Sequence, residues 1–154
     1  DSPLIRRIGK QYKVLSPWLR PSDISTDSSS SLDVILHSVK WYEKNYNKLD
    51  YIILLQPTSP YRNKFTLNKC VNEFLKEKCF TVKTIKIDIK KKKEKKILYF
   101  NNTCSPNGSF YIIPRKHIFL KEIHKNQIKH VLILDKKENI DIDNLNDFLE
   151  SNKY

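Results

Sequence analysis

Residues 56–60 gather several groups that could hold a polar ligand. Gln56 carries an amide, and Thr58 and Ser59 carry hydroxyls, so the segment offers hydrogen-bond donors and acceptors. Pro57 and Pro60 fix φ beside these groups and stiffen their presentation. The segment, called the elbow below, is therefore a candidate ligand-binding segment. An ordinary strand-to-helix loop with a helix cap is the alternative interpretation.

Asp141 and Asp143 form a second set of reactive groups. In an extended backbone, residues two apart project to the same side, so both carboxylates could face one cation. Proteins commonly hold Mg²⁺ with one or two carboxylates together with substrate phosphates. The pair is therefore a candidate metal-binding site. The alternative is structural, because Asp143 would make a good N-cap for the helix that follows.

The elbow follows the apolar run Tyr51–Leu55, which is too short for a helix. Such a run is typical of a central strand that is covered on both faces. In open α/β sheets, ligands bind just beyond the carboxyl ends of the strands. The position of the elbow therefore favours a functional role.

A polar stretch, Ser22–Ser31, leads into a helix predicted from Leu32 to Tyr46, whose apolar residues recur at helical spacing. Asp27 and the serines supply capping side chains. A helix N-terminus attracts anions and polar ligands, so this stretch is a candidate binding segment rather than a linker.

The remaining pattern alternates strands with helices. It predicts an α/β fold with a largely parallel sheet. The expected helices are Leu4–Gln11, Leu67–Leu75 with Thr66 as its cap, His117–Ile123 and Asn144–Glu150. The expected strands are Thr84–Ile89, Ile97–Phe100, Ser109–Ile113 after a tight turn at Asn107-Gly108, and Val131–Leu134.

The bulk properties limit the class of protein. A chain of 154 residues with 39% hydrophobic content suits one domain, residues 1–154, and its apolar runs are too short to span a membrane. The formal charge of +12 is concentrated in Lys90–Lys96, which is expected at a solvated hairpin tip, so nucleic-acid binding is disfavoured. Three cysteines without paired spacing predict buried or inert thiols. We expect a soluble, cytoplasmic protein.

Four segments carry a resemblance by their residues and their order. They are Leu19–Asp27 with Ser30–His37, Leu55–Arg62, Asn107–Ile112 and Ile140–Asp143. Together they resemble the CMP-N-acetylneuraminic acid synthetases, also called acylneuraminate cytidylyltransferases, over essentially the whole chain. The motif Leu-Gln-Pro-Thr-Ser-Pro is the most specific part of the match.

The resemblance implies a three-layer α/β/α, Rossmann-like nucleotidyltransferase fold and usually a homodimer. The implied enzyme joins CTP to a sialic-acid-like nonulosonic acid, with Mg²⁺, and releases pyrophosphate. Residue by residue, it implies a set of roles: Arg20, Ser29 and Ser31 for the nucleotide; Gln56, Thr58, Ser59 and Asn107 for the sugar acid; and Asp141 and Asp143 for the metal.

Two departures from the family pattern follow from the same comparison. The resemblance implies that the chain corresponds to the C-terminal part of the family's domain, without its N-terminal nucleotide-binding strands, and Ser105 stands where the family usually has arginine. A lysine nearby would not reproduce a bidentate arginine–carboxylate pair. A non-catalytic fragment, or a binding or assembly module of the same fold, is therefore the alternative to an enzyme.

Overall fold

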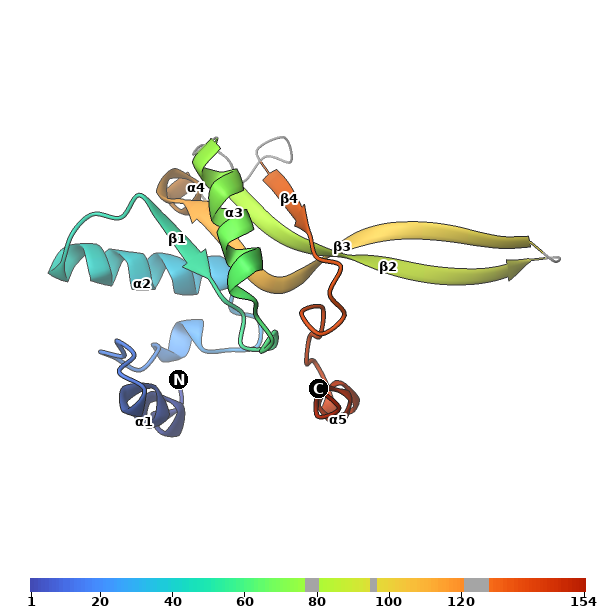
Figure 1. The fold of residues 1–154 in the computed structure, drawn as a ribbon. Helices are drawn as coiled ribbons and strands as arrows, with labels where there is room; N and C mark the ends of the chain where they lie inside the picture. Colours follow the sequence, from blue (N-terminus) through green and yellow to red (C-terminus); the bar gives the residue numbers. More distant parts are fainter. Residues whose placement is uncertain (77–80, 95–96, 121–127) are drawn as a thin grey trace. The chain divides into compact units, whose positions relative to one another are not determined.

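The computed structural model describes residues 1–154 apart from 77–80, 95–96 and 121–127, and it describes no side chain between 87 and 104. The chain forms two compact units, Asp1–Leu49 and Asp50–Tyr154 (Figure 1). The predicted single domain stays a prediction.

The first unit is helical and begins with α1, Pro3–Gln11. The short 3₁₀ helix η1 spans Ser22–Ile24, and α2 spans Ser31–Asn45. The cap of α2 is Ser30, whose hydroxyl accepts a hydrogen bond from the backbone N–H of Asp33 at 3.1 Å. Both predicted helices, and the serine cap of the second, are confirmed.

The second unit combines a sheet with helices. Its strands are β1 Tyr51–Leu54, β2 Thr81–Glu94, β3 Ile97–Pro114 and β4 Ile128–Leu132. Its helices are α3 Lys64–Lys76, α4 Arg115–Leu120 and α5 Leu145–Ser151. The residues beyond 120 that were assigned to the predicted helix His117–Ile123 lie outside the described part of the chain.

The described strands form one mixed sheet in the order β1-β3-β2-β4. The β1–β3 and β2–β3 pairs are antiparallel, and the β2–β4 pair is parallel. The α/β class is therefore confirmed, but a largely parallel sheet is not. Since β1 and β2 both oppose β3, the strands β1, β2 and β4 run in one direction and β3 alone runs against them. The three-layer, Rossmann-like arrangement stays a prediction.

Strands β2 and β3 form a long hairpin that extends well beyond the rest of the sheet (Figure 1). Pairing continues to Glu94↔Ile97, so the predicted hairpin is confirmed, while its tip at 95–96 lies outside the described residues. The predicted turn at Asn107-Gly108 is wrong, because both residues lie inside β3. Gly108 lies at an irregularity within the strand and not at a chain reversal.

Strand β1 was predicted to be central and covered on both faces, and this is wrong. It is the terminal strand in the described sheet order. Tyr51 and Ile53 are 39% and 38% exposed. An apolar run specifies a strand, but it does not specify how many neighbours that strand finds.

The core of the second unit lies between α3 and one face of the sheet. Helix α3 contributes Cys70 and Phe74, which pack on residues of β2, β3 and β4: Val82, Phe110, Ile112 and Val131. The cap of α3 is Asn63, whose side-chain oxygen accepts from the N–H of Phe65 at 2.8 Å. The predicted cap Thr66 instead donates its hydroxyl hydrogen to Glu138, because it lies within the helix.

Cys70 provides a test of this core. Burial raises the pKa of its thiol to about 11. At pH 8 the native protein should therefore hold this thiol almost entirely protonated, and its reaction with a thiol reagent should be at least about a hundredfold slower than in the unfolded chain. Because the native pKa is raised, the associated stability is present below the unfolded pKa and is lost as the pH rises toward 11.

The measurement uses a variant in which Cys79 and Cys104 are replaced by serine, so that the reagent reports on Cys70 alone. The same variant in urea gives the unfolded rate. Equal rates in the two states at pH 8 would contradict the burial of this thiol.

Candidate functional site

The centre of the candidate site is a bulge in β3 formed by residues 107–110. The register of β3 with β2 breaks between Lys83 and Ile85. Residues 107–110 therefore lie opposite Thr84 alone, and all four are buried. The hydroxyl of Thr84 donates to the carbonyl of Phe110 at 3.2 Å and accepts from its N–H at 3.0 Å. A side chain thus replaces the missing ladder partners.

Gly108 allows the elbow to approach this bulge. Its φ is +78°, a region that side-chain-bearing residues rarely adopt. A Cβ atom at this position would lie 2.4 Å from the Ser59 hydroxyl and 2.6 Å from Gln56 Oε1. The backbone of the bulge and the side chains of the elbow therefore occupy adjacent space only because residue 108 has no side chain.

Polar contacts fix the elbow in this position. Ser59 is fully buried, and its hydroxyl donates to the carbonyl of Asn107 at 2.9 Å. Arg62 donates from Nη2 to the carbonyl of Gln56 and from Nε to that of Ser109 at 3.1 Å. Burial lowers the pKa of the Arg62 guanidinium. This guanidinium therefore joins the two ends of the elbow and ties them to the bulge.

The segment after β4 closes over the same bulge. The hydroxyl of Ser109 donates to the carbonyl of Glu138 at 3.1 Å. The N–H of Ile142 donates to the carbonyl of Thr58 at 2.8 Å. These bonds bring Asp141 Oδ1 to 3.4 Å from the Ser59 hydroxyl, although the two residues are 82 positions apart in the sequence.

The second unit therefore brings together the predicted sugar-contacting and metal-binding residues. Gln56 and Thr58 are half-buried, and Ser59 is buried against Asp141. Asn107, like Ser59, is 0% exposed, and its side-chain amide donates to Asn139 Oδ1 at 2.9 Å. Of the six predicted residues, four keep atoms at the surface and two, Ser59 and Asn107, are enclosed by protein.

The capping of α5 tests the structural interpretation of Asp143. The N-cap is Asn144, whose Oδ1 accepts from the N–H of Asp147 at 3.1 Å. In return, Asp147 Oδ2 accepts from the N–H of Asn144 at 3.2 Å and from that of Asp143 at 3.0 Å. The alternative in which Asp143 is the N-cap is therefore wrong. Its exposed carboxylate is not used to cap the helix.

These carboxylates fit the donor set of a magnesium ion. Asp141 is half-buried and Asp143 is exposed, and they follow one another at a spacing of two in a segment without helix or strand. Among the described residues, no cluster of three or more acidic, histidine or cysteine side chains could hold a metal by itself. A Mg²⁺ ion held by two carboxylates would therefore need oxygen ligands from a substrate or from water.

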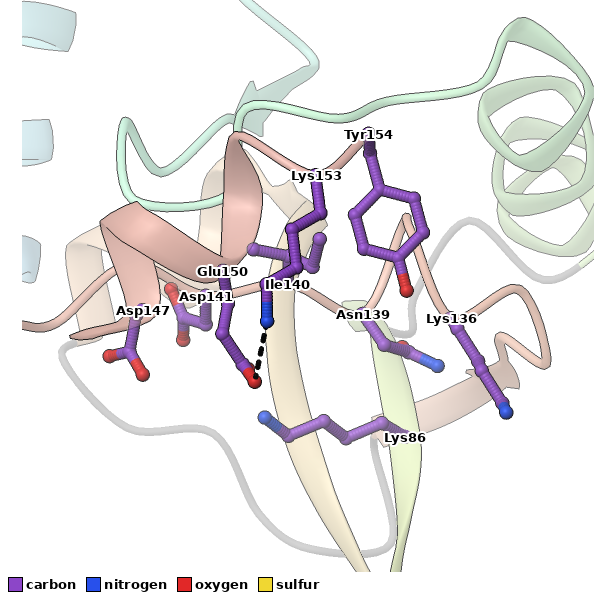
Figure 2. Close-up of a pocket in the computed structure, with 9 residues that line it drawn as sticks. All are labelled: Lys86, Lys136, Asn139, Ile140, Asp141, Asp147, Glu150, Lys153 and Tyr154. Carbon is purple, nitrogen blue, oxygen red and sulfur yellow. Dashed lines mark ion pairs between the residues drawn. The ribbon is translucent and has the colours of Figure 1, made fainter.

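Asp141 opens onto a cleft with a volume of about 400 Å³ (Figure 2). Three lysines and three carboxylates line it, and Lys153 forms an ion pair with Glu150 at 3.8 Å. Figure 2 shows the side chain of Lys86 directed toward the same carboxylate. The residues that line the cleft are Lys86, Lys136, Asn139, Ile140, Asp141, Asp147, Glu150, Lys153 and Tyr154.

The three residues predicted for the nucleotide lie in the first unit. Arg20 pairs with Asp1 at 2.7 Å and donates from Nε to the Ser25 hydroxyl at 3.2 Å. Ser29 Oγ accepts from the N–H of Thr26 at 3.0 Å, and Ser31 is the exposed first residue of α2. The nucleotide residues therefore belong to one compact unit, and the sugar and metal residues belong to the other.

Tyr111 is a site residue that motif reasoning did not select. Its hydroxyl lies 3.5 Å from Gln56 Oε1. Burial raises the pKa of Tyr111, and the negative charge of Asp141 adds to this effect. The alternation of side chains along a strand could have identified it. Phe110 and Ile112 face the core, so residue 111 projects from the opposite side of β3.

Two curated proteins are similar to the chain over most of its length. CMP-N,N'-diacetyllegionaminic acid synthase of Legionella pneumophila is 28% identical over 162 aligned positions, which cover 93% of this chain and 70% of that protein. N-acylneuraminate cytidylyltransferase of Escherichia coli O18:K1:H7 is 25% identical over 153 positions, which cover 84% of this chain and 35% of that protein. The resemblance to the CMP-sialic acid synthetases is confirmed.

The similarity has definite limits. The chain spans about two thirds of the first relative and about one third of the second. No protein-family model matches the sequence. Separately, none of the helices in the described part of the chain is long and apolar enough to cross a membrane.

Gly108 gives the first test of the site. We expect Gly108→Ala to lower the free energy of unfolding by about 2–4 kcal/mol, because a side chain would be strained at this φ and would collide with the elbow. Gly9→Ala is the matched control: it lies in a helix at an ordinary φ and should change stability by about 1 kcal/mol or less. Equal effects in urea unfolding would contradict the close approach at Gly108.

Arg62 gives the second test. Arg62→Lys keeps the charge but cannot serve both carbonyl groups at once, so we expect a loss of about 1–2 kcal/mol in unfolding free energy. The control Arg7→Lys changes an exposed residue of α1 and should stay within about 0.5 kcal/mol. If denaturation curves show no difference between these variants, Arg62 does not hold the elbow to the bulge.

Proposed function

We propose that the protein is a cytidylyltransferase that joins CTP to a sialic-acid-like nonulosonic acid and releases pyrophosphate. The observation that carries this proposal is the meeting of the Gln-Pro-Thr-Ser-Pro elbow with the segment of Asp141, where Ser59 Oγ and Asp141 Oδ1 are 3.4 Å apart. Two motifs that are distant in the sequence thus lie in contact, which supports their use in one site. The names of the two relatives support the same reaction class.

In this reaction, a hydroxyl oxygen of the sugar acid attacks the α-phosphorus of CTP. A new oxygen–phosphorus bond forms, the bond to the departing pyrophosphate breaks, and the sugar hydroxyl loses its proton. Transfers of this kind depend chiefly on alignment and on neutralising charge. The chain's own residues would therefore act by holding two substrates in line rather than by forming a covalent intermediate.

The elbow would orient the sugar acid. Gln56 and Thr58 keep half-buried polar side chains at the surface, and Pro57 restricts the backbone between them. Ser59 is buried, so it would act by keeping the elbow in place beside Asp141. Rigid presentation reduces the entropy lost when the sugar binds.

Asp141 and Asp143 would hold a magnesium ion. When bound, the ion would neutralise negative charge on the phosphates of CTP and on the attacking oxygen. The half-buried Asp141 and the exposed Asp143 provide oxygen ligands of the type that Mg²⁺ requires. The exposed side of this pair leaves room for substrate ligands.

Arg20, Ser29 and Ser31 would bind the cytidine part. The ion pair between Arg20 and Asp1 is partly exposed, at 32% and 50% for the two side chains, and such pairs contribute little free energy. A nucleotide could therefore replace Asp1 as the partner of Arg20 at small cost. The homodimer and the cytoplasmic location that the sequence suggests stay predictions.

A non-catalytic module of the same fold remains the second candidate. It is favoured by the terminal position and exposed apolar residues of β1, which offer a strand edge to another chain. Calorimetry with CTP, Mg²⁺ and a sugar acid separates the candidates. The enzyme should bind CTP in a Mg²⁺-dependent way, whereas the module should give no specific heat of nucleotide binding.

Substitution of the carboxylates tests the proposed reaction in the complete gene product. Asp141→Asn and Asp143→Asn should each lower Mg²⁺-dependent pyrophosphate release from CTP by at least about a hundredfold, because each removes a charged ligand. Glu150→Gln is the matched control, since it removes an exposed carboxylate from the same cleft and should leave turnover nearly unchanged. Unchanged turnover in both aspartate variants would overturn the metal assignment.

A further inference from the structure

The side chain of Asn107 is used entirely within the protein. Its exposed fraction is 0%. Both hydrogens of Nδ2 have acceptors, with Asn139 Oδ1 at 2.9 Å and the carbonyl of Glu138 at 3.4 Å. Oδ1 accepts from the N–H of Ser109 at 3.2 Å. Backbone partners on both sides fix which end of the amide is oxygen and which is nitrogen.

Asn139 extends this arrangement to the end of β4. While its Oδ1 accepts from Asn107, its Nδ2 donates to the carbonyl of Ile133 at 3.0 Å. The two amides therefore form a relay from the bulge of β3 to the residue that follows β4. Paired amides of this kind hold their partners in one geometry, because each loses a hydrogen bond if the other moves.

Asn139, the second member of the relay, lies two residues before Asp141 in the sequence. On the other side of Asp141, the N–H of Ile142 donates to the carbonyl of Thr58 at 2.8 Å. Asp141 is thus held between two anchors, one that starts at Asn107 and one that starts at the elbow. The Asn107 end of the first anchor is fully buried, so at that end its hydrogen bonds are protected from competition by water.

A direct contact between Asn107 and a sugar would have a clear cost. The side chain is inaccessible, and a ligand could reach its donors only by displacing Asn139 and the carbonyl of Glu138. Displacement would leave the amide oxygen of Asn139 without its donor from Asn107, which is unfavourable for a polar group away from water. The resemblance assigns Asn107 to the sugar, but the geometry favours a role within the protein.

We propose that Asn107 and Asn139 act together as positioning residues that set the place of Asp141 relative to the elbow. Asn139 has no role in the site predicted from the sequence. The inference deepens the proposed function, on which the role of Asp141 depends. It means that Asn107 affects the metal-binding side of the reaction more than the affinity for the sugar acid.

The kinetic test compares Asn107→Ala, Asn139→Ala and the double variant in the complete gene product. Each single variant should raise the Mg²⁺ concentration for half-maximal activity by about tenfold or more, as loss of a residue behind a metal ligand does. The KM for the sugar acid should change less than about threefold, and the double variant should be no worse than the singles, because both act through one relay. Asn68→Ala, an exposed change on α3, is the control and should alter neither quantity.

Hydrogen exchange supplies a readout that does not depend on turnover. In both single variants, the N–H of Ile142 should exchange at least about tenfold faster than in the wild type, because its anchor at Thr58 is no longer supported from the other side. The N–H groups of α3 should keep their wild-type rates. If Asn107→Ala fails to fold, Asn139→Ala carries the same comparison, since Asn139 is half-buried and lies outside the sheet.

The outcomes separate the two levels of the inference. A tenfold rise in the sugar KM of Asn107→Ala, without a change in Asn139→Ala, would overturn the positioning role in favour of direct contact. Unchanged exchange at Ile142 in both variants would also overturn it. Absence of CTP turnover in the wild type would instead reject the proposed function, and the exchange data would still decide whether the relay holds this segment.

Discussion

The site depends on one close approach, that of the elbow to the backbone of Gly108. Within the buried bulge of β3, Gly108 has a φ of +78°, and its missing side chain leaves the space that Ser59 and Gln56 fill. Once the elbow lies there, Ser59 can bond to the bulge and the carbonyl of Thr58 can receive Ile142. The position of Asp141 is therefore a consequence of this packing.

The polar groups around this point divide into two kinds by burial. Ser59, Ser109 and Asn107 are buried, and each has a protein partner, as the cost of an unpaired buried polar group requires. Gln56 and Asp143 retain surface, and so can exchange water for a ligand at lower cost. A rigid inner layer thus supports a polar outer layer, which is the arrangement that precise binding sites need.

The helices were predictable because their signals are local. The apolar spacing of α1, α2, α3 and α5 specifies each one without reference to the rest of the chain. The strand order of the sheet was not predictable, because it depends on pairing between distant residues and each strand pattern fits several neighbours. Thus Tyr51–Leu54 was recognised as a strand but not as a terminal one. For α3 the sequence predicted Thr66 as the cap instead of Asn63, because both residue types are favoured at helix N-caps.

The candidate site shows a different limit. Motifs identify residue types that can bind a ligand, but an asparagine or serine can satisfy the protein equally well, and only burial distinguishes these uses. Gln56 and Asn107 are both amide-bearing motif residues, yet Gln56 is half-buried at the surface and Asn107 is enclosed between β3 and the segment after β4. The bulge contributes to this difference, because its extra residues interrupt the regular alternation of side chains between the two faces of the sheet. The backbone conformation at residues 107–110 therefore determines whether a motif residue faces a ligand or the protein.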